Sequence, residues 1–129
     1  MTTLQAILAT GIAFCLAELI KMVYLFSTER KFRIFPIGGV ISSHTTSVAA
    51  LAMAVFYETG FSLLFLACVV FGLIVMRDAI GVRWEVSRHS QALNKLTKKN
   101  DYEVTGHTKL QTFAGIAFAI AVVMIFYLF

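Results

Sequence analysis

Hydrophobic residues in this chain fall into long stretches that are separated by short polar segments. The stretches cover residues 4–27, 34–57, 59–76 and 110–129. An α-helix rises about 1.5 Å per residue, so each stretch approaches the length needed to cross the roughly 30 Å hydrocarbon core of a bilayer. The pattern therefore predicts an all-α, polytopic membrane protein with four transmembrane helices.

The third stretch contains no residue that would stop a helix at its end. Beyond Asp78, apolar residues and one histidine keep a helical spacing on a single stripe. This stripe consists of Val82, Val86, His89, Leu93 and Leu96. We therefore expect the third span to continue into the cytoplasm as an amphipathic helix, with Trp84 at the membrane interface. Since the sequence has no internal repeats, residues 1–129 are predicted to form one compact membrane domain.

Composition agrees with the pattern, because 59% of the residues are hydrophobic and 14% are charged, whereas a soluble domain carries about a quarter charged residues. Apart from Lys21, lysine and arginine are found in two places, between the first and second stretches and from Arg77 to Lys109. Cytoplasmic loops of membrane proteins are enriched in these residues. We therefore expect both basic loops on the cytoplasmic side of the cell (inner) membrane and both termini outside. The net charge of +4 then needs no nucleic-acid partner.

The segment from Phe35 to Ser47 places two glycines, two adjacent serines and a histidine at the start of the second span. Glycine allows close approach of the backbone to a ligand, and hydroxyls with free N–H groups at a helix start can bind an anion. His44 can transfer a proton near neutral pH. The alternative is structural: Ser42 and Ser43 cap the helix, and His44 is buried with its hydrogen bonds satisfied.

The predicted topology brings most of the chemically active side chains to one membrane face. They are Lys21, His44, Asp78, Arg83 and His107. Glu18 lies one turn from Lys21 and is expected to pair with it inside the bundle, unless Lys21 extends to the interface. A set of histidines, cations and a glycine–serine segment suits phosphate. The histidines lack the spacing of metal ligands, so we expect no metal and no cofactor.

Three ordered motifs resemble the divergent branch of the type-2 phosphatidic acid phosphatases, which are related to acid phosphatases and vanadium haloperoxidases. The matching segments are Gly38–Thr45 (GGVISSHT, for GGxPSSHS), Asp78–Arg83 (DAIGVR, for DAxGVR) with Leu93–Leu96 (LNKL), and Gly106–Gly115 (GHTKLQTFAG, for GHTPxEVxxG). Ile41 stands at the proline of the first motif, and Gln111 stands at the carboxylate of the last.

This resemblance implies metal-independent hydrolysis of a phosphate ester through a phosphohistidine. Carried over to this chain, it makes His107 the nucleophile and His44 the acid that protonates the leaving oxygen, and Gln111 takes the position that supports the nucleophile. The residues that would hold the phosphate oxygens through side chains or backbone N–H groups, or support those that do, are Arg83, Ser42, Ser43, Gly39, Lys21, Arg88 and Asp78.

The predicted function is hydrolysis of a phosphomonoester or pyrophosphate of a membrane lipid at the cytoplasmic face. Its substrate would be a phosphatidylglycerophosphate-like lipid or a polyprenyl phosphate. One alternative is a member of the same fold that binds phospholipid headgroups without catalysis, because Gln111 carries no charge. Another is a small transporter or assembly factor, which predicts polar residues reaching the opposite face, where only Glu58 is found. A bundle this small can need a second copy of the chain, forming a homo-oligomer, to close its site.

Overall fold

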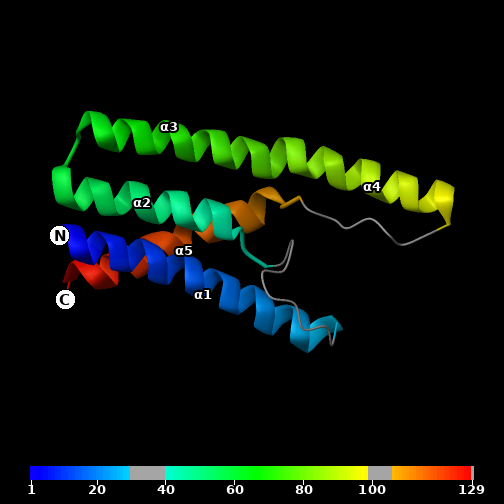
Figure 1. The fold of residues 1–129 in the computed structure, drawn as a ribbon, viewed down its shortest axis with the longest axis horizontal. Coiled ribbons are helices and arrows are strands. Elements are labelled where there is room, and N and C mark those ends of the chain that lie inside the picture. Colours follow the sequence, from blue (N-terminus) through cyan, green and yellow to red (C-terminus); the bar gives the residue numbers. More distant parts are fainter. Residues whose placement is uncertain (30–39, 99–105, 129) are drawn as a thin grey trace.

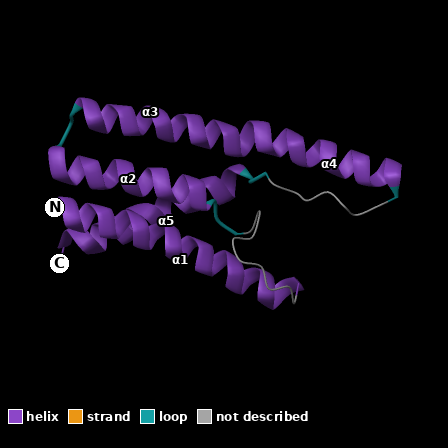
Figure 2. Cartoon of the chain, viewed as in Figure 1, coloured by secondary structure: helices purple, strands orange, loops and turns teal. Residues whose placement is uncertain are grey.

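The computed structural model describes residues 1–29, 40–98 and 106–128, and within these residues the fold is all-α (Figure 2). Its elements are α1 (Thr3–Glu29), α2 (Ser43–Thr59), α3 (Leu63–Arg77), the π-helical turn η1 (Asp78–Val82), α4 (Arg83–Thr97) and α5 (Lys109–Leu128). Because α3, η1 and α4 follow one another without a break, the described residues form four helical rods.

The four rods run up and down alternately, with both termini and the α2–α3 turn at one end (Figure 1). Helix α2 is central, in contact with α1, α3 and α5. Contacts between residues far apart in sequence hold the end with the termini together: the Met1 amino group donates to Tyr57 O at 3.4 Å, and the rings of Tyr57 and Tyr127 stack with centroids 4.1 Å apart. The opposite end is where the predicted functional motifs begin.

Three described helices are long and apolar enough to cross a membrane. They cover Thr3–Thr28, Leu63–Thr97 and Lys109–Leu128. Helix α2, the second predicted span, has 17 residues and begins with the polar sequence SHTTS. Because α2 packs against three other helices, Ser43, Thr45 and Thr46 of this polar start are fully buried in protein. The crossing of the membrane by α2 stays a prediction.

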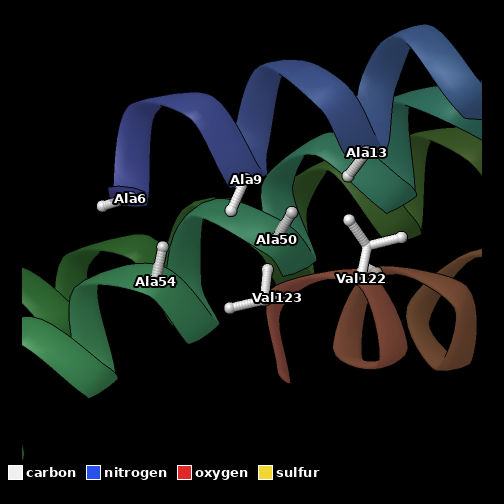
Figure 3. Close-up of a cluster of buried hydrophobic side chains, with 8 residues drawn as sticks. Ala6, Ala9, Ala13, Ala50, Ala54, Val122 and Val123 are labelled. Atoms are coloured by element: carbon white, nitrogen blue, oxygen red, sulfur yellow. The ribbon is translucent and has the colours of Figure 1, made fainter. Parts of the chain in front are cut away.

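Small side chains form the core where α1, α2 and α5 meet. Ala9 and Ala13 of α1 are fully buried and face Ala50 of α2 and Val123 of α5 (Figure 3). Small residues at helical spacing let helices approach closely, which is the main source of packing energy in lipid. The large apolar side chains of α1 point outward instead, for example Leu4 with 66% exposure. An outer surface of this kind suits a hydrocarbon solvent.

The predicted continuation of the third helix beyond Asp78 is confirmed, because η1 and α4 extend α3 to Thr97. In Figure 1, α4 projects past the ends of the other rods. The apolar stripe along α4 is exposed, with Val82 at 61% and Leu96 at 80%. The extension is therefore an amphipathic helix whose apolar stripe is not covered by the described part of the chain.

Candidate functional site

The start of α2 is a capped helix end with a buried and an exposed side. Ser42 is the N-cap, and its Oγ accepts hydrogen bonds from Thr45 N at 3.4 Å and from Thr45 Oγ1 at 3.0 Å. Ser42 and Ser43 are both 0% exposed, whereas His44 is exposed. The capping alternative is thus confirmed for Ser42, and the expectation of a buried His44 is wrong. At a helix start, successive side chains point in different directions, which leaves the imidazole on the outer side.

A buried ion pair connects α1 to this helix start. Lys21 is 4% exposed, and its ammonium donates to Glu18 Oε1 at 3.0 Å and to Ser43 Oγ at 3.2 Å. The predicted pairing of Glu18 with Lys21 is confirmed, and Lys21 does not extend to the interface. A buried ion pair is costly unless hydrogen bonds complete it. Ser43 supplies one such bond, while Glu18 Oε2 has no hydrogen-bond partner.

The π-helical turn η1 brings a carboxylate and a guanidinium together. Arg83 Nε lies 2.5 Å from Asp78 Oδ2, and the side chains are 42% and 39% exposed. A π turn spaces hydrogen-bonded residues five apart, and Arg83 N correspondingly donates to Asp78 O. Within the described residues, Nε is the nitrogen of Arg83 that is engaged, so its two terminal guanidinium nitrogens are available to an anion.

The same turn positions His107 through the backbone. His107 N donates to Ala79 O of η1 at 3.3 Å, and the preceding Gly106 N donates to Ser87 Oγ of α4 at 2.7 Å. His107 is 5% exposed, and its buried Nδ1 has no hydrogen-bond partner among the described residues. A Cβ on Gly106 would lie 2.6 Å from Trp84 Cα, so only glycine permits this approach.

Helix α5 packs closely on the start of α2. Ser42 N donates to Gln111 O at 3.3 Å, and Thr46 Oγ1 donates to Gly115 O at 3.2 Å. A Cβ on Gly115 would lie 2.9 Å from Ser42 O. The absence of a side chain at Gly115 therefore lets α2 approach α5, and this contact sets the position of α5 relative to His44.

Gln111 takes part in a capping box at the start of α5. Thr108 Oγ1 accepts from Gln111 N at 3.2 Å, and Gln111 Oε1 accepts from Thr108 N at 2.8 Å. The sequence T-x-x-Q is the signature of a capping box, so this pair of hydrogen bonds could have been predicted from the sequence. The side-chain oxygen of Gln111 is therefore occupied by the backbone N–H of Thr108, the residue that follows His107.

We expect Gln111→Ala to lower the free energy of unfolding by about 1 kcal/mol, because it removes one half of the capping box. Gln111→Glu should keep the stability, since glutamate caps equally well. Thermal unfolding of the purified protein in detergent measures both. Equal stability of the alanine and glutamate variants would contradict a capping role.

Burial lowers the pKa of His107 below its ordinary value of 6.5. The nearby Lys21 ammonium lowers this pKa further, the Gln111 side chain opposes the shift, and His44 and Arg83 contribute smaller decreases. His107 is consequently neutral at pH 7. The charged groups that act on His44 are Arg83, Lys21, Glu18 and Asp78. The predicted convergence on one end of the bundle is supported by this mutual electrostatic influence.

One predicted site residue is not part of this group. Arg88 is 65% exposed on α4 and pairs with Glu85 at 3.2 Å. Gly39 lies outside the described residues, so its place in the site stays a prediction. Within residues 1–29, 40–98 and 106–128, no three His, Cys, Asp or Glu side chains gather in a way that could hold a metal ion.

An open pocket of about 300 Å³ adjoins the buried histidine. It is lined by Ile80, Trp84, His107, Thr108 and Lys109. Of these residues, only His107 was predicted to belong to the site. The other four come from η1, from the start of α4 and from the start of α5, so no pattern along the chain places them together.

The fold and this cluster define a class: a small helical membrane protein whose histidines and cations gather at one end of the bundle. The chain belongs to the divergent PAP2 family, whose family model matches residues 3–122, and the resemblance drawn from its motifs is thereby confirmed. The chain is 35% identical over 94 residues to the uncharacterized membrane protein YuiD of Bacillus subtilis (strain 168), covering 70% of this chain. The match covers 60% of that relative, so the chain spans about three fifths of its length. No solved structure matches.

Proposed function

We propose that this protein is a lipid-phosphate phosphatase that removes a phosphate group through a phosphohistidine at the cytoplasmic membrane face. One arrangement carries the proposal: a buried histidine, held through its backbone by η1 and through Gly106 by α4, lies within the electrostatic influence of a second, exposed histidine and a half-exposed arginine. Phosphoryl transfer depends mainly on positioning and on charge stabilisation. A phosphatidylglycerophosphate-like lipid and a polyprenyl phosphate both present phosphate at this depth.

The reaction has two steps. The buried Nδ1 leaves His107 Nε2 to attack phosphorus, the bond to the ester oxygen breaks, and that oxygen takes a proton from His44. A water molecule then attacks the phosphohistidine, His44 accepts a proton from this water, and phosphate and neutral His107 are released. The terminal nitrogens of Arg83 bind two phosphate oxygens as a fork. Lys21, Ser42 and Ser43 form the buried polar layer next to His44.

The pH dependence follows from the neutral form of the nucleophile. The pKa of His107 lies below 6.5, and only the unprotonated imidazole attacks, so turnover should fall as the pH decreases through that lowered value. We expect the acidic limb of the kcat/KM profile, which reports the pKa values of the free enzyme, below pH 6.5, and no change from this group above it. Phosphate release measured across this range tests the assignment. An acidic limb above 7 would contradict it.

The decisive experiment measures phosphate release by purified protein from a panel of lipid phosphates, with and without vanadate, a mimic of pentacoordinate phosphorus. Vanadate-sensitive release that persists in EDTA would support the proposal. Loss of activity in EDTA that zinc or magnesium restores would contradict the metal-independent route. No release from any lipid on the panel would favour the second candidate.

The second candidate is a headgroup-binding protein without turnover. The observation that favours it is the state of His107 Nδ1, which has no hydrogen-bond partner while Gln111 Oε1 accepts from Thr108 N. Without an acceptor on Nδ1, the tautomer that exposes an attacking Nε2 is less strongly favoured. Vesicle binding that requires Arg83, combined with no phosphate release, would identify this function.

The proposal includes a topology. All four helical rods cross the inner membrane, the site and α4 face the cytoplasm, and both termini face outward, because lysine and arginine concentrate near the site. We expect a single cysteine at position 98 to resist a membrane-impermeant thiol reagent in intact cells, and one at position 61 to react. Both substitutions, Lys98→Cys and Phe61→Cys, are made in a background without Cys15 and Cys68. Labelling at 98 but not at 61 would reverse the topology.

A further inference from the structure

Lys109 is a cation to which the proposed mechanism assigns no task. It is exposed and lines the pocket next to His107. In the described part of the chain, its ammonium makes no hydrogen bond or ion pair. Thr108 and the buried His107 provide the other polar groups of the pocket, while Ile80 and Trp84 provide apolar walls.

The position of Lys109 in its helix is electrostatically unfavourable. It is the first residue of α5, where the helix dipole is positive and a cation destabilises the helix. The capping box engages the N–H groups of Thr108 and Gln111, which leaves those of Lys109 and Leu110 directed out of the helix start. Residues that break a local rule of stability are expected at functional positions.

A second observation places an incompletely satisfied polar side chain at this helix start. His107 lines the same pocket and is 5% exposed, and within the described residues its buried Nδ1 has no hydrogen-bond partner, so the ring has polar capacity left for a ligand at its other nitrogen. Arg83 belongs to the electrostatic surroundings of His107 but does not line the pocket. The two cations, Arg83 and Lys109, therefore occupy different places around His107.

We propose that Lys109 and the start of α5 form a second anion subsite, which selects lipids that carry a second phosphate beside the one that is removed. This inference rests on the proposed function. The outer phosphate lies at Arg83 and His107, the second phosphate at the Lys109 ammonium, and the first carbons of the lipid lie against Ile80 and Trp84. A lipid monophosphate leaves the subsite empty.

The chemistry of the subsite concerns the leaving group. When His107 Nε2 attacks the outer phosphorus of a lipid diphosphate, the bond to the bridging oxygen breaks and its electron pair stays on that oxygen. The leaving group is then a lipid monophosphate, whose additional negative charge Lys109 stabilises. In a lipid whose two phosphates are separated by glycerol, Lys109 binds the second phosphate without contact with the leaving oxygen.

The test compares farnesyl phosphate, farnesyl diphosphate and phosphatidylglycerol phosphate as substrates of wild type, Lys109→Gln and Lys109→Arg. The matched control is Lys95→Gln, which removes an exposed cation from α4. A hydrogen bond to a charged group contributes enough to change affinity by about tenfold to a hundredfold. We expect Lys109→Gln to raise KM by that factor for a lipid with two phosphates and less than twofold for farnesyl phosphate, with recovery in Lys109→Arg.

The expected loss of affinity should come without a loss of stability, because removing a cation from the start of α5 favours the helix. The melting temperature of Lys109→Gln should thus equal or exceed that of wild type. An increase in KM for farnesyl diphosphate alone, or for phosphatidylglycerol phosphate alone, supports the subsite and identifies the spacing of the two phosphates that it accepts. An equal increase in KM for all three lipids, or no increase for any of them, would overturn the proposal.

Binding of a methylene-bridged farnesyl diphosphonate, which cannot be hydrolysed, separates the subsite from the reaction. If no lipid is turned over, the phosphatase proposal fails. Binding of this analogue that is weakened about tenfold or more by Lys109→Gln, and not by Lys95→Gln, would still support the subsite. Binding that both variants weaken equally, or that neither changes, would overturn it.

Discussion

His107→Ala should abolish phosphate release, with a decrease in kcat on the order of 10⁴-fold to 10⁶-fold, because covalent catalysis has no alternative route once the nucleophile is removed. The backbone that carries the imidazole is held by the His107 N–Ala79 O hydrogen bond and by the Gly106 N–Ser87 Oγ hydrogen bond. Neither hydrogen bond involves the histidine side chain, so both remain when this side chain is removed. The alanine variant should consequently fold like wild type and keep its affinity for vesicles that contain lipid phosphate.

The covalent intermediate provides a second readout. Brief incubation with a lipid labelled with ³²P at the outer phosphate should leave acid-labile label on wild type and none on His107→Ala. The control is His89→Ala, since His89 is an exposed histidine of α4 away from the pocket. Turnover of His107→Ala within tenfold of wild type would exclude His107 as the nucleophile, whatever the behaviour of the control.

Gly106→Ala should reduce kcat by about a hundredfold or more although it changes no chemical group, because an error of about 1 Å in position can cost that much. The added Cβ would lie 2.6 Å from Trp84 Cα, 2.8 Å from Trp84 N and 2.9 Å from Arg83 O. All three neighbours are backbone atoms of α4 and cannot rotate away. The segment must therefore move, and His107 moves with it.

Gly11→Ala is the matched control, because nothing lies within 4 Å of a Cβ built on this exposed residue of α1. It should leave activity unchanged and, as alanine is the better helix former, increase stability by up to about 1 kcal/mol. Phosphate release and thermal unfolding of both variants distinguish a displaced site from general destabilisation. Full activity of Gly106→Ala would contradict the close approach of the His107 segment to α4.

Much of this architecture follows from local patterns. The lengths of the apolar stretches predicted α1, α3 and α5 as candidate spans, and the uninterrupted helical spacing after Asp78 predicted α4. The i,i+3 spacing of Glu18 and Lys21 predicted their ion pair. Each of these properties depends on residues close together in sequence, and so does the capping box of Thr108 and Gln111, which the T-x-x-Q pattern would have indicated.

The amino-acid sequence by itself determined the membrane class, the order of the helices and the family, because hydrophobicity, helical period and motif spacing are properties of the chain. Only the tertiary structure decided which groups meet. In the folded chain Ser43 is buried and accepts a hydrogen bond from Lys21, whereas His44 is exposed. The π turn pairs Asp78 with Arg83 and binds the backbone of His107. These contacts depend on how closely helices approach, and that distance is set by Gly106 and Gly115 together with the alanines of the core.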